Sequence, residues 1–191
     1  PRSNVSLYGQ TTNIPAALDA GITISLAPDW SMGGSQNMLD ELRFADNWDN
    51  TNWNNRLSTK DIVTMATVNP AKVLALDTRI GKLAPGYLAD IAVFTGDRTK
   101  PYDAIVAARP KDVRLVMIGG TVLYGDKILE PAAPTAPPCE TVDICTVSKF
   151  LCVATSDSAN KLNQTYAEIK AKLSQAMTDA DALTTGDGFN F

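Results

Sequence analysis

The chain has 191 residues, 45% of them hydrophobic and 20% charged, which is sufficient for one or two small globular domains. Its net charge is −4 and its 17 basic residues form no cluster, which argues against a nucleic-acid-binding surface. No apolar run approaches the roughly 18 residues that a membrane-spanning helix needs. The sequence has no histidine, which excludes a histidine general base, a Ser-His-Asp triad and a histidine-rich zinc site formed by this chain alone.

The first elements that we predict are a short helix and a strand. Residues 14–20 carry a proline in the first turn and are followed by Gly21, which is typical of a helix and its stop signal. Residues 22–26 are β-branched and apolar on both faces, so we expect a strand buried on both sides, as in a parallel sheet. Asp29 follows this strand, and α/β folds gather their catalytic groups at the carboxyl ends of strands. For an arbitrary aspartate at such a place, the simpler interpretation is a turn cap.

A helix and a polar loop are predicted next. Ser35 predicts the cap of a helix that runs through about Asn47 with one apolar face. Residues 46–55 are polar apart from Trp48 and Trp53, which indicates an exposed or pocket-facing loop.

The sequence then predicts two more helices. Ser58 and Asp61 have the spacing of a capping box, which predicts the start of a helix. Asn69 and Pro70 break that helix, and the N-cap followed by proline predicts a further helix over 70–76.

After residue 77 the pattern changes to short strands and turns. Residues 84–87 carry proline and then glycine at the two central positions, which is typical of a type II turn. A pair of glycines at 119–120 predicts a tight hairpin. The elements predicted in this part are strands over 90–94, 113–118 and 121–124, with one or two helical turns over 101–108.

The C-terminal part consists of a linker, a cysteine-containing segment and a helix. Residues 131–138 are rich in proline and alanine, which indicates a stiff linker. Cys139, Cys145 and Cys152 lack the C-x-x-C spacing of a zinc site. A disulfide between two of them, with the third pairing elsewhere, would suit an exported protein, and free buried thiols are the alternative. Apolar residues then recur at helical spacing and predict an amphipathic helix with a docking face, formed by Leu162, Tyr166, Ile169, Leu173 and Ala176.

Three stretches, in this order and at these separations, carry a family resemblance. The first is P-R-S-N at 1–4, followed by A-L-D-A-G-I at 17–22 and the strand that leads to Asp29. The second is T-V-N-P-A-K-V-L-A-L at 67–76, and the third is I-G-K-L-A-P-G-Y-L-A-D at 80–90. Together they resemble the C-terminal third of the amidohydrolase superfamily, in its cytosine-deaminase and chlorohydrolase-like branch.

This resemblance implies an α/β fold in four parts. Residues 1–76 would be the end of a metal-dependent (β/α)8 barrel, a TIM barrel, and residues 77–130 would supply strands of the family's small β-sandwich. The linker over 131–138 and the cysteine segment with its tail helix, 139–191, fall outside the resemblance or at its edge. A complete barrel takes about 250 residues. We therefore expect the chain, which begins at Pro1 without an initiator methionine, to be a fragment of a longer protein.

The resemblance also implies the chemistry. In the family, the aspartate that ends the eighth barrel strand binds a catalytic divalent metal and takes the proton of the attacking water. By this resemblance Asp29 is both metal ligand and general base, and zinc is the expected metal because carboxylate oxygen suits zinc beside imidazoles. The family's other ligands are histidines on earlier strands. Trp30, beside the metal position, and Asn4, where the family places a loop near the pocket, are expected to bind substrate. Their alternatives are a packing aromatic and a turn residue.

These inferences predict the C-terminal fragment of a hydrolase that acts on non-peptide C–N bonds of a small molecule, by deamination of a ring or hydrolysis of a cyclic amide. The alternatives are hydrolytic dechlorination of a heteroaromatic ring and a non-catalytic amidohydrolase-like scaffold. We expect the isolated chain to be inactive. A strand over 22–26 without barrel neighbours predicts a homo-oligomer or a bound N-terminal fragment. The clustered cysteines favour an exported or periplasmic protein, with the cytoplasm as the alternative.

Overall fold

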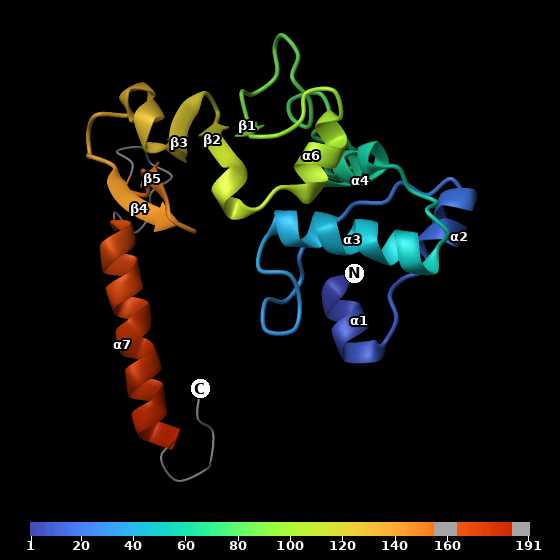
Figure 1. Cartoon of the computed structure of the whole chain (residues 1–191), viewed down its shortest axis with the longest axis horizontal. Helices are drawn as coiled ribbons and strands as arrows, with labels where there is room; N and C mark the ends of the chain where they lie inside the picture. The colour runs from blue at the N-terminus through green and yellow to red at the C-terminus, as the bar shows by residue number, and fades with distance from the viewer. Residues whose placement is uncertain (155–163, 185–191) are drawn as a thin grey trace. The chain divides into compact units, whose positions relative to one another are not determined.

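The computed structural model describes residues 1–154 and 164–184, which fall into two compact units (Figure 1). The first unit ends at Gly120 and the second begins at Thr121. None of the described helices is long and apolar enough to cross a membrane. The division into four parts proposed from the sequence stays a prediction.

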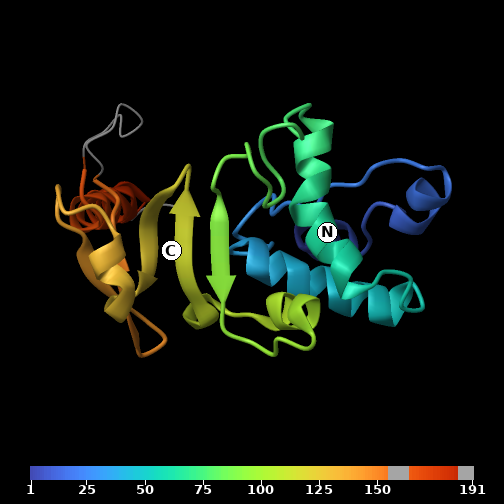
Figure 2. The same ribbon diagram turned by 90° about the horizontal axis from the view of Figure 1, so that it is seen from above.

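The first unit is mainly helical. Its apolar core gathers side chains of several helices, among them Leu42 of α3, the fully buried Ile62 of α4 and Val106 of α6. Figure 2 shows α4 crossing α3, the two helices whose apolar faces meet in this core. The helices of this unit are α1 (Arg2–Tyr8), α2 (Ile14–Asp19), α3 (Met38–Asn52), α4 (Thr59–Ala66), α5 (Val68–Val73) and α6 (Pro101–Ala107).

Local signals set several of these helix ends as predicted. The side chain of Ser58 accepts from the backbone N–H of Asp61 at 3.2 Å, and the Asp61 carboxylate accepts from the backbone N–H of Ser58 at 2.9 Å. This reciprocal arrangement is the predicted capping box, and it satisfies two amides that the first turn of α4 leaves without helical partners. The predicted helix over 14–20 is confirmed as α2, with the Asn13 side chain as its cap.

The predicted strand over 22–26 is not present. These residues are extended, but they pair with no strand among the described residues. Helices flank them instead, so their hydrogen bonds go to helix ends: the Leu26 amide donates to the carbonyl of Met65 at 2.8 Å, and Asn69 Nδ2 donates to the carbonyl of Ile24 at 2.8 Å. An extended segment becomes a β-strand only when a neighbouring strand supplies the ladder, and none is described beside this one.

The predicted loop over 46–55 is also wrong in its first part, because α3 continues to Asn52. Its polar residues lie on the solvent side of the helix, while Asp49 is fully buried and accepts from the amides of Arg56 and Leu57 at 3.1 and 2.9 Å. The polar composition of residues 46–52 therefore reflects the exposed face of α3 and not the end of the helix.

Two other helix bounds differ from the prediction. α3 begins at Met38 and is capped by Asn37. Ser35, the predicted cap, donates its hydroxyl to the carboxylate of Glu41 instead. The helix expected over 70–76 is α5, which begins at Val68 and ends at Val73.

The described strands are five, and every pairing described within a unit is antiparallel. In the first unit β1 (Ile91–Phe94) pairs with β2 (Val113–Ile118). In the second unit β5 (Val147–Leu151) lies between β3 (Thr121–Asp126) and β4 (Glu140–Ile144). These strands and α6 confirm the predicted elements of residues 90–124. The type II turn is confirmed as well, since the amide of Tyr87 donates to the carbonyl of Ala84 at 3.1 Å and Gly86 has a φ of 86°.

The second unit is held together by a disulfide and a buried ion pair. Cys139 precedes β4, Cys152 follows β5, and their Cα atoms lie 4.4 Å apart in the disulfide. Of the two alternatives for the cysteines, the disulfide is confirmed, while the third cysteine, Cys145, is a free and exposed thiol in the turn between the two strands. The ammonium of Lys149, a fully buried side chain, lies 2.5 Å from a carboxylate oxygen of Asp126.

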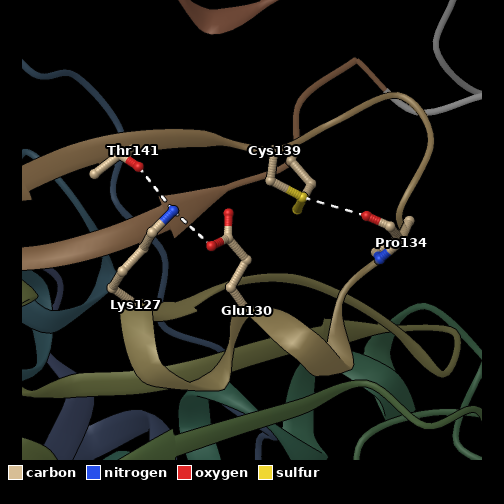
Figure 3. The surroundings of a disulfide bond; sticks show 6 residues. Lys127, Glu130, Pro134, Cys139 and Thr141 are labelled. Carbon is tan, nitrogen blue, oxygen red and sulfur yellow. Dashed lines mark hydrogen bonds and ion pairs between the residues drawn. A yellow bond between two sulfur atoms is a disulfide. The ribbon is translucent and has the colours of Figure 1, made fainter.

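A short 3₁₀ helix, Lys127–Ala132, packs beside the disulfide (Figure 3). The ammonium of Lys127 donates to Thr141 Oγ1 at 2.9 Å and pairs with Glu130 at 2.5 Å. The linker expected over 131–138 thus begins inside a helical turn. The C-terminal helix is α7 (Tyr166–Thr184), and Leu162, the first residue of the predicted apolar stripe, lies outside the described residues.

Candidate active site

Asp29 lies at the end of the extended segment, on the surface of the first unit. Its Oδ2 accepts a hydrogen bond from the hydroxyl of Ser3 at 3.1 Å. Ser3 is in the first turn of α1 and only 3% exposed, so its hydroxyl is held in place by the surrounding atoms. The structure therefore brings together two parts of the first sequence motif that are 26 residues apart.

Asn4 and Trp30 lie next to these two residues in the chain. Residues 2–8 form the helix α1, so Ser3 and Asn4 are in a helix and not in the loop or turn expected from the sequence. Asn4 is half-buried, and Trp30 is 40% exposed. The indole ring packs against the backbone of Gly33, where an added Cβ would lie 3.1 Å from the ring. Contact of either residue with a substrate stays a prediction.

A buried carboxylate that the sequence analysis missed anchors the loop after Asp29. Glu41 of α3 is 2% exposed and accepts from the Ser35 hydroxyl at 2.5 Å and from the Arg2 amide at 3.3 Å. The sequence signal was available, because Glu41 lies three residues after Met38 and so on the apolar face of its helix. A charged residue at such a position needs buried partners.

The same loop approaches α1 closely at Gly34. A Cβ at this position would lie 2.1 Å from the carbonyl oxygen of Trp30 and 3.1 Å from the Cβ of Ser3. The loop after Asp29 is therefore tied to Ser3 through Asp29 and to Glu41 through Ser35, and it leaves no room for a side chain at Gly34.

Asp29 fits a divalent metal as one ligand of a larger set. Within residues 1–154 and 164–184, no three cysteine, aspartate or glutamate side chains are close enough together to hold a metal ion. Because Ser3 donates to Oδ2, Oδ1 is the oxygen that remains available for a metal or a water. One carboxylate oxygen suits zinc, but zinc requires three or four protein or solvent ligands. The others would come from outside the described residues.

A separate hollow of about 770 Å³ lies among α1, α3, α4 and α6, and its lining includes Asp40, Asp46 and Asp103. Burial raises the pKa of the Asp46 carboxyl, and the nearby carboxylates of Asp49 and Asp103 raise it further. Asp29 does not line this hollow, and Arg2 is the one motif residue in its lining, so we do not assign it to the active site.

The comparison with known sequences defines the class of protein. The sequence profile of the amidohydrolase family matches residues 1–123, which is more than half of the chain. The chain belongs to the amidohydrolase family. The match includes α1, the Asp29 segment and β2, and it ends within β3.

Individual relatives are similar over the same region. The chain is 30% identical over 140 residues to 5′-deoxyadenosine deaminase of Methanothermobacter thermautotrophicus, an alignment that covers 68% of this chain and 32% of that protein. It is 31% identical over 143 residues to 5-methylthioadenosine/S-adenosylhomocysteine deaminase of Thermococcus onnurineus, with the same coverage. The chain thus spans about a third of the length of the curated relatives it matches.

The fold of the chain is similar to parts of solved enzyme structures. Atrazine chlorohydrolase of Arthrobacter aurescens TC1, complexed with zinc, is 25% identical with a TM-score of 0.53, over 71% of this chain and 31% of that chain. Guanine deaminase of E. coli is 23% identical with a TM-score of 0.58, over 65% of this chain and 32% of that chain. The second likeness supports the fold alone.

Proposed function

We propose that the chain is the C-terminal part of a metal-dependent hydrolase that acts on a non-peptide C–N bond of a small molecule, by deamination of a ring or hydrolysis of a cyclic amide. The observation that carries this proposal is the Asp29 carboxylate, exposed at the end of the extended segment and oriented by Ser3 at 3.1 Å, in a chain of the amidohydrolase family. The relatives named deaminases support the bond type.

In this proposal Asp29 has two tasks. Its carboxylate both binds the metal and accepts the proton of the attacking water, while Oδ2 also accepts the hydrogen bond from Ser3. The metal, when bound, acts as a Lewis acid and lowers the pKa of water toward neutral. An adjacent carboxylate can then accept the proton and pass it to a leaving amine, which is ordinary general acid–base catalysis.

The substrate pocket is proposed from the neighbours of Asp29. Trp30 offers a partly exposed indole for stacking against a ring, and Asn4 offers an amide one residue beyond Ser3. The remaining ligands are proposed to come from preceding strands of a (β/α)8 barrel, of which residues 1–76 would be the end. The strands of 77–130 are proposed to belong to the family's β-sandwich. The Cys139–Cys152 disulfide supports an oxidising compartment for the protein, since structural disulfides persist there.

A second candidate function is hydrolytic dechlorination of a heteroaromatic ring. It is supported by the 25% identity and the TM-score of 0.53 to atrazine chlorohydrolase. The same activated water would displace chloride in place of an amine. Assaying the full-length protein with aminated and chlorinated forms of one ring separates the two.

Substitution of Asp29 in the full-length, zinc-loaded protein tests the proposal. We expect Asp29→Asn to lower turnover by about 10²–10⁴-fold, because an amide cannot accept a proton. The melting temperature should change little, since the side chain is exposed. Asp77→Asn, at another exposed aspartate, is the matched control and should keep full activity. Turnover of the Asp29 variant close to that of the control would remove Asp29 from the mechanism.

A further inference from the structure

The helix α7 carries an exposed apolar stripe and lies beyond the part of the chain that matches the family profile. Leu173 is 63% exposed and Met177 61% exposed, while Tyr166 is 38% exposed. With Ile169 and Ala180 these residues recur at intervals of three and four, so they lie on one face of the helix. A contiguous row of exposed apolar side chains on a protein surface often marks an interaction site.

The first turn of α7 is fixed to the disulfide-bonded hairpin. Both oxygens of the Glu140 carboxylate accept from the helix, one from the Tyr166 amide at 2.6 Å and the other from the Ala167 amide at 3.0 Å. Glu140 directly follows Cys139 of the disulfide. In Figure 1 the helix starts at β4 and β5 and runs beyond them. The hairpin therefore presents the helix at a fixed point, and the stripe remains exposed.

Two lysines and two aspartates beside the stripe are placed so that each lysine faces an aspartate when the helix is paired with a reversed copy of itself. Glu168, which accepts from Thr165 in the first turn, lies outside this pattern. Lys170 and Asp181 are eleven residues apart, close to three helical turns, so they border the stripe on the same side. Lys172 and Asp179 are seven residues apart, close to two turns, and border it on the other side. The two lysines are in the N-terminal half, the two aspartates are in the C-terminal half, and both pairs have their midpoint between residues 175 and 176.

We propose that α7 pairs with α7 of a second copy of this chain in an antiparallel arrangement. A two-fold axis at the common midpoint places Lys170 of one copy opposite Asp181 of the other, and Lys172 opposite Asp179. In antiparallel helix pairs, flanking positions on the same side of the seam meet each other, so all four lysines find an aspartate. The same axis brings Leu173 and Met177 of each copy together at the centre.

A parallel pair would not satisfy these charges. It would place lysines beside lysines at one end of the seam and aspartates beside aspartates at the other, which is destabilising. Stacking of the apolar stripe is possible in both directions, but only the antiparallel direction also matches the charge pattern. The second copy is therefore the occupant that this surface fits.

Charge reversal in the 191-residue chain tests the proposal by sedimentation equilibrium. We expect the wild-type chain to dimerise and the acidic variant Lys170→Asp/Lys172→Asp to dissociate about tenfold more readily or more, because four attractive contacts become repulsive. The basic variant Asp179→Lys/Asp181→Lys should behave likewise. An equimolar mixture of the two variants should form heterodimers, and the variant with all four changes should regain the wild-type affinity.

The control is Lys60→Asp/Lys72→Asp, which makes the same change in net charge at exposed positions of the first unit. It should dimerise as the wild type does. Should circular dichroism show that a charge variant has lost helix, Leu173→Lys interrupts the stripe with a good helix former and should give a monomer. A monomeric wild type, an acidic variant that dimerises like the control, or a dimer that survives Leu173→Lys would each overturn the proposal.

Discussion

The two units of this chain are stabilised by different means. The unit up to Gly120 relies on an apolar core around Ile62, with no disulfide among its residues. The unit from Thr121 relies on the Cys139–Cys152 bond and on the buried Lys149–Asp126 pair. The first unit lies within the region that matches relatives over about a third of their own length, whereas the second is small enough to need a covalent staple. The first unit therefore depends on apolar packing for its stability, and the second depends on a covalent bond and an ion pair.

The largest expected effect concerns the first unit, which we expect to lack most of its metal ligands in the 191-residue chain alone. We expect no stoichiometric zinc binding in the sub-micromolar range and no hydrolase activity, because Asp29 supplies only one of the three or four ligands that zinc needs. Calorimetric titration measures this directly. Adding the preceding part of the parent protein should restore binding, while tight binding by the isolated chain would show that its ligand set is complete.

The next largest effect is expected in the apolar core. Ile62→Ala removes a side chain with no exposed surface and should destabilise the first unit by roughly 2–5 kcal/mol. Val73→Ala, at a side chain that is 60% exposed, is the control and should have little effect. Hydrogen exchange read separately for each unit measures the change. Equal losses of protection in both units would mean that they unfold together.

Removal of the disulfide should affect the other unit. Cys139→Ser opens a loop between residues 13 apart and should cost roughly 2–4 kcal/mol in the second unit, with the first unit unchanged. Cys145→Ser, at the exposed free thiol, should be nearly neutral. Urea unfolding of the two variants compares them, and similar midpoints would show that the disulfide contributes little.

The smallest effect is a pH dependence within the first unit. Burial and the carboxylates of Asp49 and Asp103 raise the pKa of Asp46, so the folded state binds this proton more tightly than the unfolded state. The ionised form is destabilising above the folded pKa, and this effect is lost as pH falls through it. Asp46→Asn should therefore raise the melting temperature near neutral pH but not near pH 3, at about which Asp46 would be largely protonated.

Asp97 provides a control of opposite sign. Hydrogen bonds from the amide and hydroxyl of Thr99 lower the pKa of its carboxyl, so its contribution to stability is present above the unfolded pKa and lost as pH falls. Asp97→Asn should lower the melting temperature near neutral pH, and the difference should shrink in acid. Melting temperatures that change in the same direction for Asp46→Asn and Asp97→Asn would contradict the opposite pKa shifts of the two carboxyls.

Features with short-range causes could be predicted from the sequence. The Ser58–Asp61 capping box and the Pro85-Gly86 turn depend on residues within four positions, and both are present. The family, and with it the expectation that Asp29 is the residue to examine, also followed from motifs along the chain.

Features with long-range causes could not be predicted. The segment over 22–26 has the composition of a strand, but strand formation depends on neighbours that composition does not specify. The hydrogen bond from Ser3 to Asp29 joins residues 26 positions apart, and nothing within the P-R-S-N motif specifies this contact. Which cysteines pair was likewise open, because sequence spacing does not determine disulfide connectivity.

The close approach at Gly34 has a consequence for mutational tolerance. Even alanine would need to displace the backbone of Trp30, since its Cβ would lie 2.1 Å from that carbonyl oxygen. At Gly119 and Gly120 an added Cβ would meet no atom within 4 Å, so the obstacle there is only a positive φ. In a library of single substitutions, Gly34 should reject every replacement, and the variants should lose the orientation of the adjacent Asp29 before they lose the fold. Intolerance at Gly34 would thus report on the backbone geometry of the loop that follows Asp29.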